Sequence, residues 1–282
     1  MNLKYVSSCG NEYDLIAGDI HTTRDSDFHE YAWSADTTSL QYGTRVNRFK
    51  KAALELEIEL IFKGKRSQID SEIDSLRNEF EYDIKNKQVG KLYWNDWYLN
   101  IYVIDSSTNE YGGNYLRNKL KVYAPYPFWI RERTYTIETT AEETASEEET
   151  DKIYDYTYKY TYGKRRINSI QIESSGSVNF RLVVFGAFTV LNLAIGSHVY
   201  NVDYAANAGE YMVIDSRDYL DYEKKCYVQK SGGGTENAFD YRNPNYELFS
   251  KLEEGRHVVA YHGSGRIELT VFEERSEPTW TA

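Results

Sequence analysis

The strongest structural signal in the chain is the run Leu54-Glu55-Leu56-Glu57-Ile58-Glu59-Leu60-Ile61-Phe62. Every second position of this run is apolar, and three glutamates lie between the apolar positions. In a β-strand alternate side chains point to opposite faces, whereas the same pattern would scatter apolar residues around a helix. The run therefore predicts a sheet strand with one buried face and one hydrated face.

A single helix is predicted directly after this strand, over residues 66–87. Ser67 or Asp70 can cap its start, and acidic residues crowd its first half, where the helix dipole favours them. The apolar stripe should pack against a sheet, because it occupies one face of the helix. The side chains that recur at three- and four-residue steps are Ile69, Ile73, Leu76, Phe80 and, at the end, Ile84.

Strands are expected to resume over 92–104, which contains Trp94 and Trp97, and over 119–123. They lead to the motif Ala124-Pro125-Tyr126-Pro127-Phe128-Trp129. Two prolines spaced two apart cannot both donate to a strand ladder, so the motif marks the end of a strand. We expect a hinge out of a first domain at this point.

The second half again predicts short strands, separated by Gly, Asn and Asp turns, with no helical pattern between them. This spacing favours an antiparallel β-sandwich, so the expected fold class is mainly β, with one helix in the first domain. Alternation is clearest at Val178, Phe180, Leu182 and Val184 and at Ile267, Leu269 and Val271; further strands are expected over 167–172, 211–214, 224–228 and 257–261.

Residues 138–151 include seven acidic side chains. Like charges at this density repel, so the segment is predicted to be a solvated linker or a protruding loop. A calcium site is the alternative, although the segment lacks the Gly and Asn turns of calcium loops. The expected domains are an N-terminal domain over 1–133, this linker over 134–152 and a β-sandwich over 153–282.

Composition narrows the function classes. Residues 1–133 carry 18 Lys and Arg against 20 Asp and Glu, and the remainder 15 against 24, for a net charge of −11. A protein that grips nucleic acid neutralises phosphates, so the acidic second half argues against that role. The N-terminus has no apolar segment of the secretory type, and no apolar run approaches the ~18 residues of a membrane helix. Cys9 and Cys226 can form one disulfide, but we expect two free thiols in a reducing compartment.

No catalytic, cofactor-binding or metal-ligating residue is predicted. His257 and His262 lie five apart, which puts them on opposite faces of a strand and suits shared metal binding poorly. Gly263-Ser264-Gly265 lacks the full nucleophile-elbow spacing and is expected to be a hairpin turn. Gly232-Gly233-Gly234 lacks the Lys and Ser/Thr of a phosphate loop and is expected to be a flexible loop. The remaining histidines, His21, His29 and His198, are expected to be surface or capping residues like the other two.

Tyrosine is unusually abundant, with 27 copies that raise the aromatic share to 15%. Five tyrosines alternate with polar residues over 154–162, and alternation would place all five on one strand face. That face is compatible with a sugar-stacking platform, with a subunit contact or with the cover of a hydrophobic seam. These tyrosines are Tyr154, Tyr156, Tyr158, Tyr160 and Tyr162.

Four features of the first half together resemble the distal tail proteins of long-tailed, non-contractile bacteriophages, which cap the tail tube at the adsorption apparatus. They are the glutamate-alternating strand, the helix after it, the Trp/Tyr strand over 93–103 and the proline-aromatic motif over 124–129. Three later segments look like the closing strands and tail of the same family. These are Asn237-Ala238-Phe239, Leu252-Glu253-Glu254-Gly255 and Glu273-Glu274-Arg275-Ser276-Glu277-Pro278-Thr279-Trp280.

The resemblance implies a structural, non-enzymatic hub protein in the virion, at the phage tail tip, assembled in the cytoplasm of the bacterial host. Such proteins form a hexameric ring through the N-terminal domain and carry a galectin-like β-sandwich. The implied partners are copies of the chain itself, the tail tube protein and a tail-associated lysin or fibre protein. Receptor-binding proteins are a further option, whereas specific nucleic acid and membranes are not expected.

Two other functions stay open at this point. One is a carbohydrate-binding adhesin module for host cell-surface glycans, and the other is a glycoside hydrolase fragment. Within a ring, Glu55, Glu57 and Glu59 could line a channel and repel passing DNA, because a negative lumen repels phosphates. A solvated outer face is the alternative for that strand.

Overall fold

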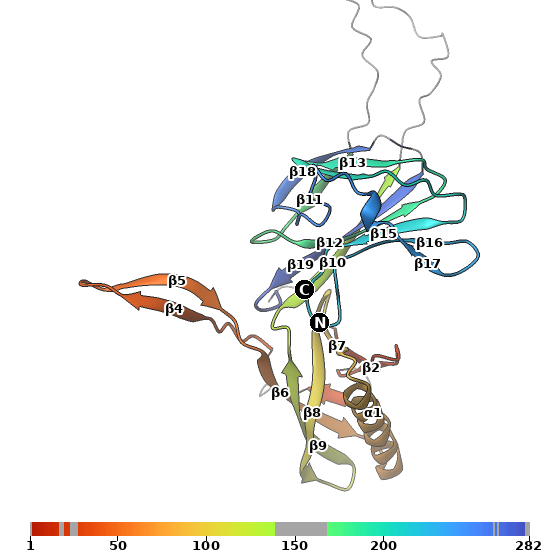
Figure 1. The fold of residues 1–282 in the computed structure, drawn as a ribbon. Helices are drawn as coiled ribbons and strands as arrows, with labels where there is room; N and C mark the ends of the chain where they lie inside the picture. Colours follow the sequence, from red (N-terminus) through yellow and green to blue (C-terminus); the bar gives the residue numbers. More distant parts are fainter. Residues whose placement is uncertain are drawn as a thin grey trace, which may run out of the picture. The chain divides into compact units, whose positions relative to one another are not determined.

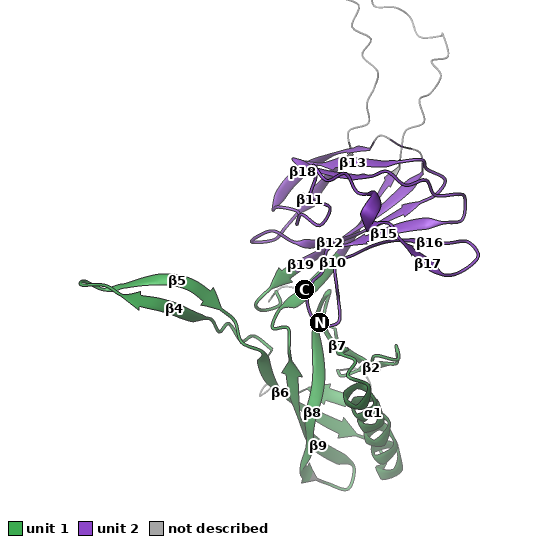
Figure 2. Ribbon diagram, viewed as in Figure 1, with its two compact units in different colours: residues 1–132, 274–282 green, residues 133–273 purple. Residues whose placement is uncertain are grey.

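The computed structural model describes residues 2–16, 20–22, 28–138, 168–261, 263 and 265–279. This part of the chain is mainly antiparallel β-sheet with one long α-helix, which confirms the predicted fold class. The chain divides into two compact units, coloured differently in Figure 2. The first consists of Met1–Glu132 and Glu274–Ala282, and the second of Arg133–Glu273.

The first unit is a sheet covered by helix α1 (Arg66–Asn86), as Figure 1 shows. Its strands neighbour one another in the order β3, β6, β9, β8, β7, β1, β2, and β10 pairs with β8 through Ile130 and Tyr98. The strands are β1 (Leu3–Val6), β2 (Glu12–Asp14), β3 (Ile20–Thr22), β6 (Leu54–Lys63), β7 (Gly90–Trp94), β8 (Trp97–Tyr111), β9 (Tyr115–Ala124) and β10 (Trp129–Glu138).

Strand β6 has the predicted two faces. The alternating apolar side chains from Leu54 to Phe62 are at most 5% exposed, whereas Glu55 and Glu57 are exposed on the other face, where Ile61 is half-buried. The buried side chains of α1 pack into the same core, so the sheet and the helix cover each other's apolar surfaces. Those helix residues are Ile69, Ile73, Leu76 and Phe80, as the helical spacing predicts.

The ends of α1 differ from the prediction. Neither Ser67 nor Asp70 caps the helix; the Gln68 side chain instead accepts from the Lys65 backbone N–H at 3.3 Å. Asp70 instead pairs with Arg66, the first residue of the helix, at 2.9 Å. Ile84 is 44% exposed and lies outside the buried stripe.

The strand expected over 92–104 is in fact a hairpin. Strand β7 ends at Trp94 and β8 begins at Trp97, and these two tryptophans pair across the turn. Asn95 adopts a left-handed φ of 53°, a conformation that asparagine tolerates better than most residues. The proline-aromatic motif does end a strand, since β9 stops at Ala124 and β10 starts at Trp129.

The second unit contains two antiparallel sheets around one apolar core, as the sandwich pattern predicts. One sheet has the order β17, β16, β15, β12, β19, followed by β10, and the other β11, β18, β13, β14. The elements are β11 (Asn168–Ile172), β12 (Asn179–Phe185), β13 (Leu191–Ile195), β14 (His198–Val202), β15 (Tyr211–Asp215), β16 (Lys225–Gln229), β17 (Thr235–Asn237), the 3₁₀ helix η1 (Phe239–Tyr241), β18 (Gly255–Tyr261) and β19 (Arg266–Arg275).

The segment over 263–265 is not a hairpin turn, because β18 and β19 lie in different sheets. The chain crosses from one sheet to the other between β18 and β19, and Ser264 lies outside the described residues. Gly265 has a φ of 109°, and a Cβ there would lie 2.5 Å from the Phe185 carbonyl oxygen, so this crossing requires glycine. The glycines over 232–234 connect β16 to β17, which confirms the loop prediction.

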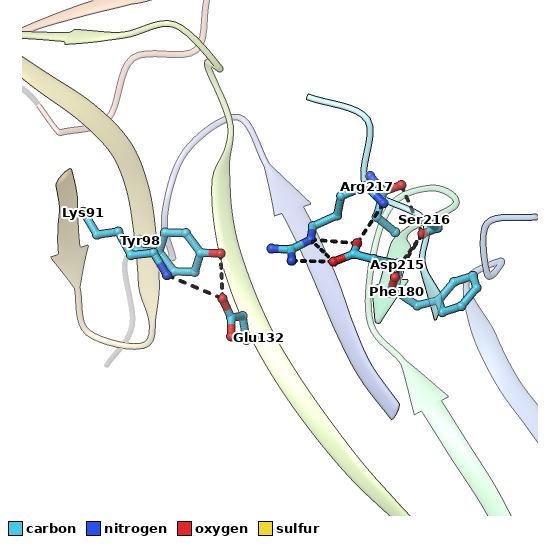
Figure 3. A network of polar contacts seen from close by, with 8 residues as sticks. Lys91, Tyr98, Glu132, Phe180, Asp215, Ser216 and Arg217 are labelled. Carbon is cyan, nitrogen blue, oxygen red and sulfur yellow. Dashed lines mark hydrogen bonds and ion pairs between the residues drawn. The ribbon is translucent and has the colours of Figure 1, made fainter. Parts of the chain in front are cut away.

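A polar cluster fixes the loop after β15 in the second unit (Figure 3). The Arg217 guanidinium binds both Asp215 carboxylate oxygens, the shortest contact being 2.6 Å. It lies 3.7 Å from the Tyr222 ring centroid and 4.3 Å from that of Phe272. Planar stacking and a two-pronged ion pair are both properties of arginine that lysine lacks.

The C-terminal boundary of the sequence-based division is wrong. The second domain was expected to extend over 153–282. The second unit instead ends at Glu273, and residues from 274 onward belong to the first unit. The Arg275 guanidinium lies 5.5 Å from the Trp97 ring centroid of β8, and Glu277 lies 3.9 Å from His29. Through these contacts the C-terminal segment packs on the first unit. The predicted acidic linker lies largely outside the described residues.

Candidate subunit interface

A hairpin of β4 (Ser34–Ser39) and β5 (Thr44–Lys50) forms a separate two-stranded sheet in the first unit. Figure 1 shows it standing apart from the other strands of that unit. All its side chains are exposed except the half-buried Asp36. A two-stranded hairpin without further packing is marginally stable in water. We call it the arm; sequence reasoning did not detect it.

The arm is amphipathic. A register shift beside Asp36 leaves Asn47 as an extra residue on β5. Directly paired residues share a face, so Phe49 opposite Ala35 and Val46 opposite Thr37 lie on the same side. Phe49 is 65% exposed and Val46 is 46% exposed, so no other described residue covers this apolar face.

The opposite face of the arm is polar and internally satisfied. Asp36 accepts from Arg48 at 3.0 Å and lies 3.7 Å from the Lys50 ammonium. The Asn47 side-chain amide donates to the Thr38 hydroxyl at 2.8 Å. The contrast between the faces indicates that the apolar face is the one suited to another protein surface.

The tip of the arm adds further apolar surface. Tyr42 is 87% exposed and Leu40 is 56% exposed in the turn between the strands. Each strand of the arm also has one edge that pairs with no other described strand, and its backbone groups can pair with a strand of another chain. The arm therefore combines the two features, apolar side chains and open backbone edges, that favour protein–protein contact.

An open cavity of about 940 Å³ lies near the N-terminus of α1. Lys63, Lys65, Arg66 and Arg117 contribute cationic groups to its lining, and Glu110 is the carboxylate among the lining residues. Glu110 pairs with Arg117 at 3.3 Å and accepts from the Tyr115 hydroxyl at 2.8 Å, which raises the pKa of Tyr115. The cavity has the charge to attract carboxylates, but not the paired acids of a glycosidase.

The sequence-selected histidines are not brought together. His198 lies 3.1 Å from the Ser250 hydroxyl, and His257 lies 2.8 Å from the Glu253 carbonyl oxygen. His21 lies in β3, the His29 ring contacts that of Trp94, and His262 is outside the described residues. Over the described ranges, no three His, Cys, Asp or Glu side chains form a metal-binding group.

The glutamates of β6 face lysines of the neighbouring strand. Glu55 pairs with Lys121 at 2.7 Å, and Glu57 pairs with Lys119 at 2.6 Å. Opposite charges at this spacing cancel each other's field over longer distances. This part of the sheet face therefore supplies little of the net negative potential that a DNA-repelling lumen needs.

Other sequence predictions have mixed outcomes. Both cysteines are free thiols; Cys9 is exposed and Cys226 is buried. The tyrosines over 154–162 lie outside the described residues. No helix in the described part of the chain is both long and apolar enough to cross a membrane.

Comparison with known proteins gives matches by structure only. No family model matches the chain, and no curated protein matches it by sequence. Among solved structures, a chain of the phage P2 baseplate in its activated conformation with Ca matches with a TM-score of 0.64 at 10% identity, covering 98% of this chain and 99% of that one. The same baseplate with Sr gives 0.62 at 12% identity, covering 98% and 99%.

The crystal structure of SPP1 Dit matches with a TM-score of 0.57 at 12% identity, covering 97% of this chain and 99% of that one. It is described as a paradigm of the hub adsorption apparatus in phages that infect Gram-positive bacteria. At such low sequence identity, these TM-scores show that the folds are similar. Nearly the whole chain thus has a Dit-like fold of the kind found in phage baseplates and tail hubs, which confirms the resemblance found in the sequence.

Proposed function

We propose that this protein is a structural, non-enzymatic hub subunit of a phage tail tip. In this proposal the first unit forms a homohexameric ring that joins the tail tube to a tail-associated lysin or fibre protein. The second unit is expected to be galectin-like and to face the adsorption apparatus, where receptor-binding proteins are further partners. The protein is then part of the virion.

The arm is the observation that carries the proposal. A cyclic ring uses head-to-tail contacts, in which one patch meets a different patch on the neighbour. The arm suits this contact because its apolar face has no covering surface among the residues that the structure describes. Covering that face against a neighbour removes apolar surface from water at roughly 25 cal/mol for each Å².

The full chain should be tested by native mass spectrometry and negative-stain microscopy at high protein concentration. We expect ring particles of six copies, each of 32.9 kDa. The double variant Val46→Asp/Phe49→Asp places two charges on the apolar face and should leave monomers. The matched control Ser34→Asp/Asn47→Asp adds two charges to the polar side and should still form rings.

A strictly monomeric wild-type chain, tested with tube and lysin partners present, would overturn the proposal. Rings from the Val46→Asp/Phe49→Asp variant would exclude the arm as their contact. A glycan array and a cell-wall hydrolysis assay address the two rival functions. Saturable glycan binding that is lost with the tyrosines over 154–162 would favour an adhesin, and turnover of polysaccharide would favour a hydrolase.

A further inference from the structure

Trp33 lies at the base of the arm, one residue before β4. Its ring centroid is 5.9 Å from that of Phe128, and its indole N–H donates to the Ser276 hydroxyl at 3.1 Å. The Lys51 ammonium, one residue after β5, lies 5.8 Å from the Trp33 ring centroid. Both connections between the arm and the rest of the first unit therefore meet at this indole.

The two partners of Trp33 lie at special places along the chain. Phe128 belongs to the proline-aromatic motif, shortly before the chain passes into the second unit at Arg133. Ser276 follows shortly after the chain has returned from the second unit at Glu274. One side chain thus touches the outgoing and the returning segments, both within the first unit.

Each partner is itself held in place. Phe128 packs on Tyr126 with 5.3 Å between ring centroids, and the neighbouring Pro127 is buried. The returning segment is fixed by Arg275 over the ring of Trp97, which is 1% exposed. Trp33 therefore contacts two packed segments in two different ways, by ring packing on Phe128 and by a hydrogen bond to Ser276.

Lys51 completes the base. Its ammonium donates to the Ala32 carbonyl oxygen at 3.5 Å, which ties the two ends of the arm together. Partial burial lowers the pKa of Lys51, and Glu30 and Glu277 oppose that shift. The C-terminal segment thus contributes the Ser276 hydroxyl and the Glu277 carboxylate to the surroundings of the arm's base.

We propose that Trp33 is the positioning residue that holds the arm in one direction. The C-terminal segment over 274–279 then forms part of the surface on which Trp33 packs. The inference rests on the proposed function, in which the arm contacts a neighbouring subunit. A hairpin free to swing about its base loses that freedom on binding, which weakens association. Seating Trp33 removes much of this cost beforehand, because the arm is then held in its binding direction.

Pulsed electron paramagnetic resonance can measure the arm's direction in the full-length monomer. Nitroxide labels are placed at Ser39→Cys on the arm and Asn78→Cys on α1, in a Cys9→Ser background. We expect one narrow distance distribution in this background and a several-fold broader one after Trp33→Ala. Trp33→Phe keeps the ring and should give an intermediate width, as should Ser276→Ala, which removes the hydrogen-bond acceptor.

Tyr42→Ala is the control, since Tyr42 lies at the tip of the arm and is 87% exposed. It should leave the distance distribution unchanged. An unchanged distribution in Trp33→Ala, with the fold intact by circular dichroism, would overturn the inference. So would equal broadening in Tyr42→Ala, because the arm would then be sensitive to any truncation.

Assembly provides the second readout. Trp33→Ala should raise the protein concentration needed for half-maximal ring formation by about tenfold. A change of this size corresponds to the entropy lost when a few side chains are immobilised on binding. Assembly of Trp33→Ala at the wild-type concentration, despite a broadened arm, would refute the positioning role. If the wild-type chain forms no rings at all, the proposed function fails, while the distance measurement still decides whether Trp33 seats the arm.

Discussion

The hydroxyl group of Tyr5 donates a hydrogen bond to the Asp83 carboxylate, which joins β1 to the end of α1. Asp83 is 1% exposed, and its other oxygen accepts from the Ser8 backbone N–H at 3.1 Å and the Ser8 hydroxyl at 2.5 Å. A buried carboxylate needs such donors, and the C-terminal end of a helix dipole adds to its cost. The three donors together hold the charge in place.

Tyr5→Phe should lower the free energy of unfolding by about 2 kcal/mol, because it removes a hydrogen bond to a charged group and leaves the group buried. Urea titration followed by circular dichroism measures the change. Tyr42→Phe, at an exposed position, is the control and should have no measurable effect. Equal effects of the two substitutions would show that the buried pair contributes nothing specific.

Alkaline pH should destabilise the wild-type protein through the same residue. Burial and the hydrogen bond to Asp83 raise the pKa of Tyr5 above its ordinary value of 10.0. Above pH 10 the unfolded chain therefore loses a proton that the folded chain keeps, so the stabilising contribution, complete below pH 10, decreases as pH rises. Urea midpoints between pH 8 and 11 should fall more steeply for wild type than for Tyr5→Phe.

The two thiols should react very differently with a thiol reagent at pH 8. Cys9 is exposed, whereas burial raises the pKa of Cys226 to about 12 and leaves little thiolate to react. We expect one rapid equivalent in the folded protein and two after unfolding in urea. Cys9→Ser should abolish the rapid reaction; a rapid equivalent that survives this substitution would place Cys226 within reach of solvent.

Arg217→Ala should lower the free energy of unfolding by about 3–5 kcal/mol, because it leaves the Asp215 carboxylate without its buried partner. Arg217→Lys should recover only part of the loss, since lysine cannot bind both oxygens while stacking between two rings. Thermal unfolding followed in the near-ultraviolet measures both variants. Full recovery by lysine would contradict a role for the planar guanidinium.

Exchanging charges on the β6–β9 pair tests whether its field is balanced. Glu57→Lys should weaken folding, because it faces Lys119 with a second cation, and adding Lys119→Glu should restore the wild-type stability. The exchanged pair has the same net charge, so DNA passage through an assembled tail should be unaffected. Slower DNA ejection with the exchanged pair would revive the idea of a negative lumen built by this strand.

The sequence predicts an element well where burial is periodic and local. The buried positions of strand β6 alternate throughout, and α1 keeps its buried apolar side chains on one face, so simple periods identify both. The β7–β8 hairpin is missed because apolar and aromatic residues continue through it, although Asn95-Asp96 is a turn signal. Continuous apolar character hides the turn.

The arm and the tail illustrate what local patterns cannot show. The extra residue Asn47 places Val46 and Phe49 on one face although they are three positions apart, which breaks the period of two. The return of residues 274–279 depends on contacts with Trp33 and Trp97, far away in the sequence. Neither the amphipathic arm nor the contacts at its base therefore leave a signal that a window of neighbouring residues can reveal.

Because the first unit includes both ends of the chain, the second unit is inserted into it rather than appended to it. The strands that open and close the insertion, β10 and β19, are neighbours in one sheet, and Thr134 and Thr270 lie 3.0 Å apart across them. An insertion with adjacent ends can be exchanged without redesigning its host. Replacing residues 133–273 with another module should therefore leave the core of the first unit continuous.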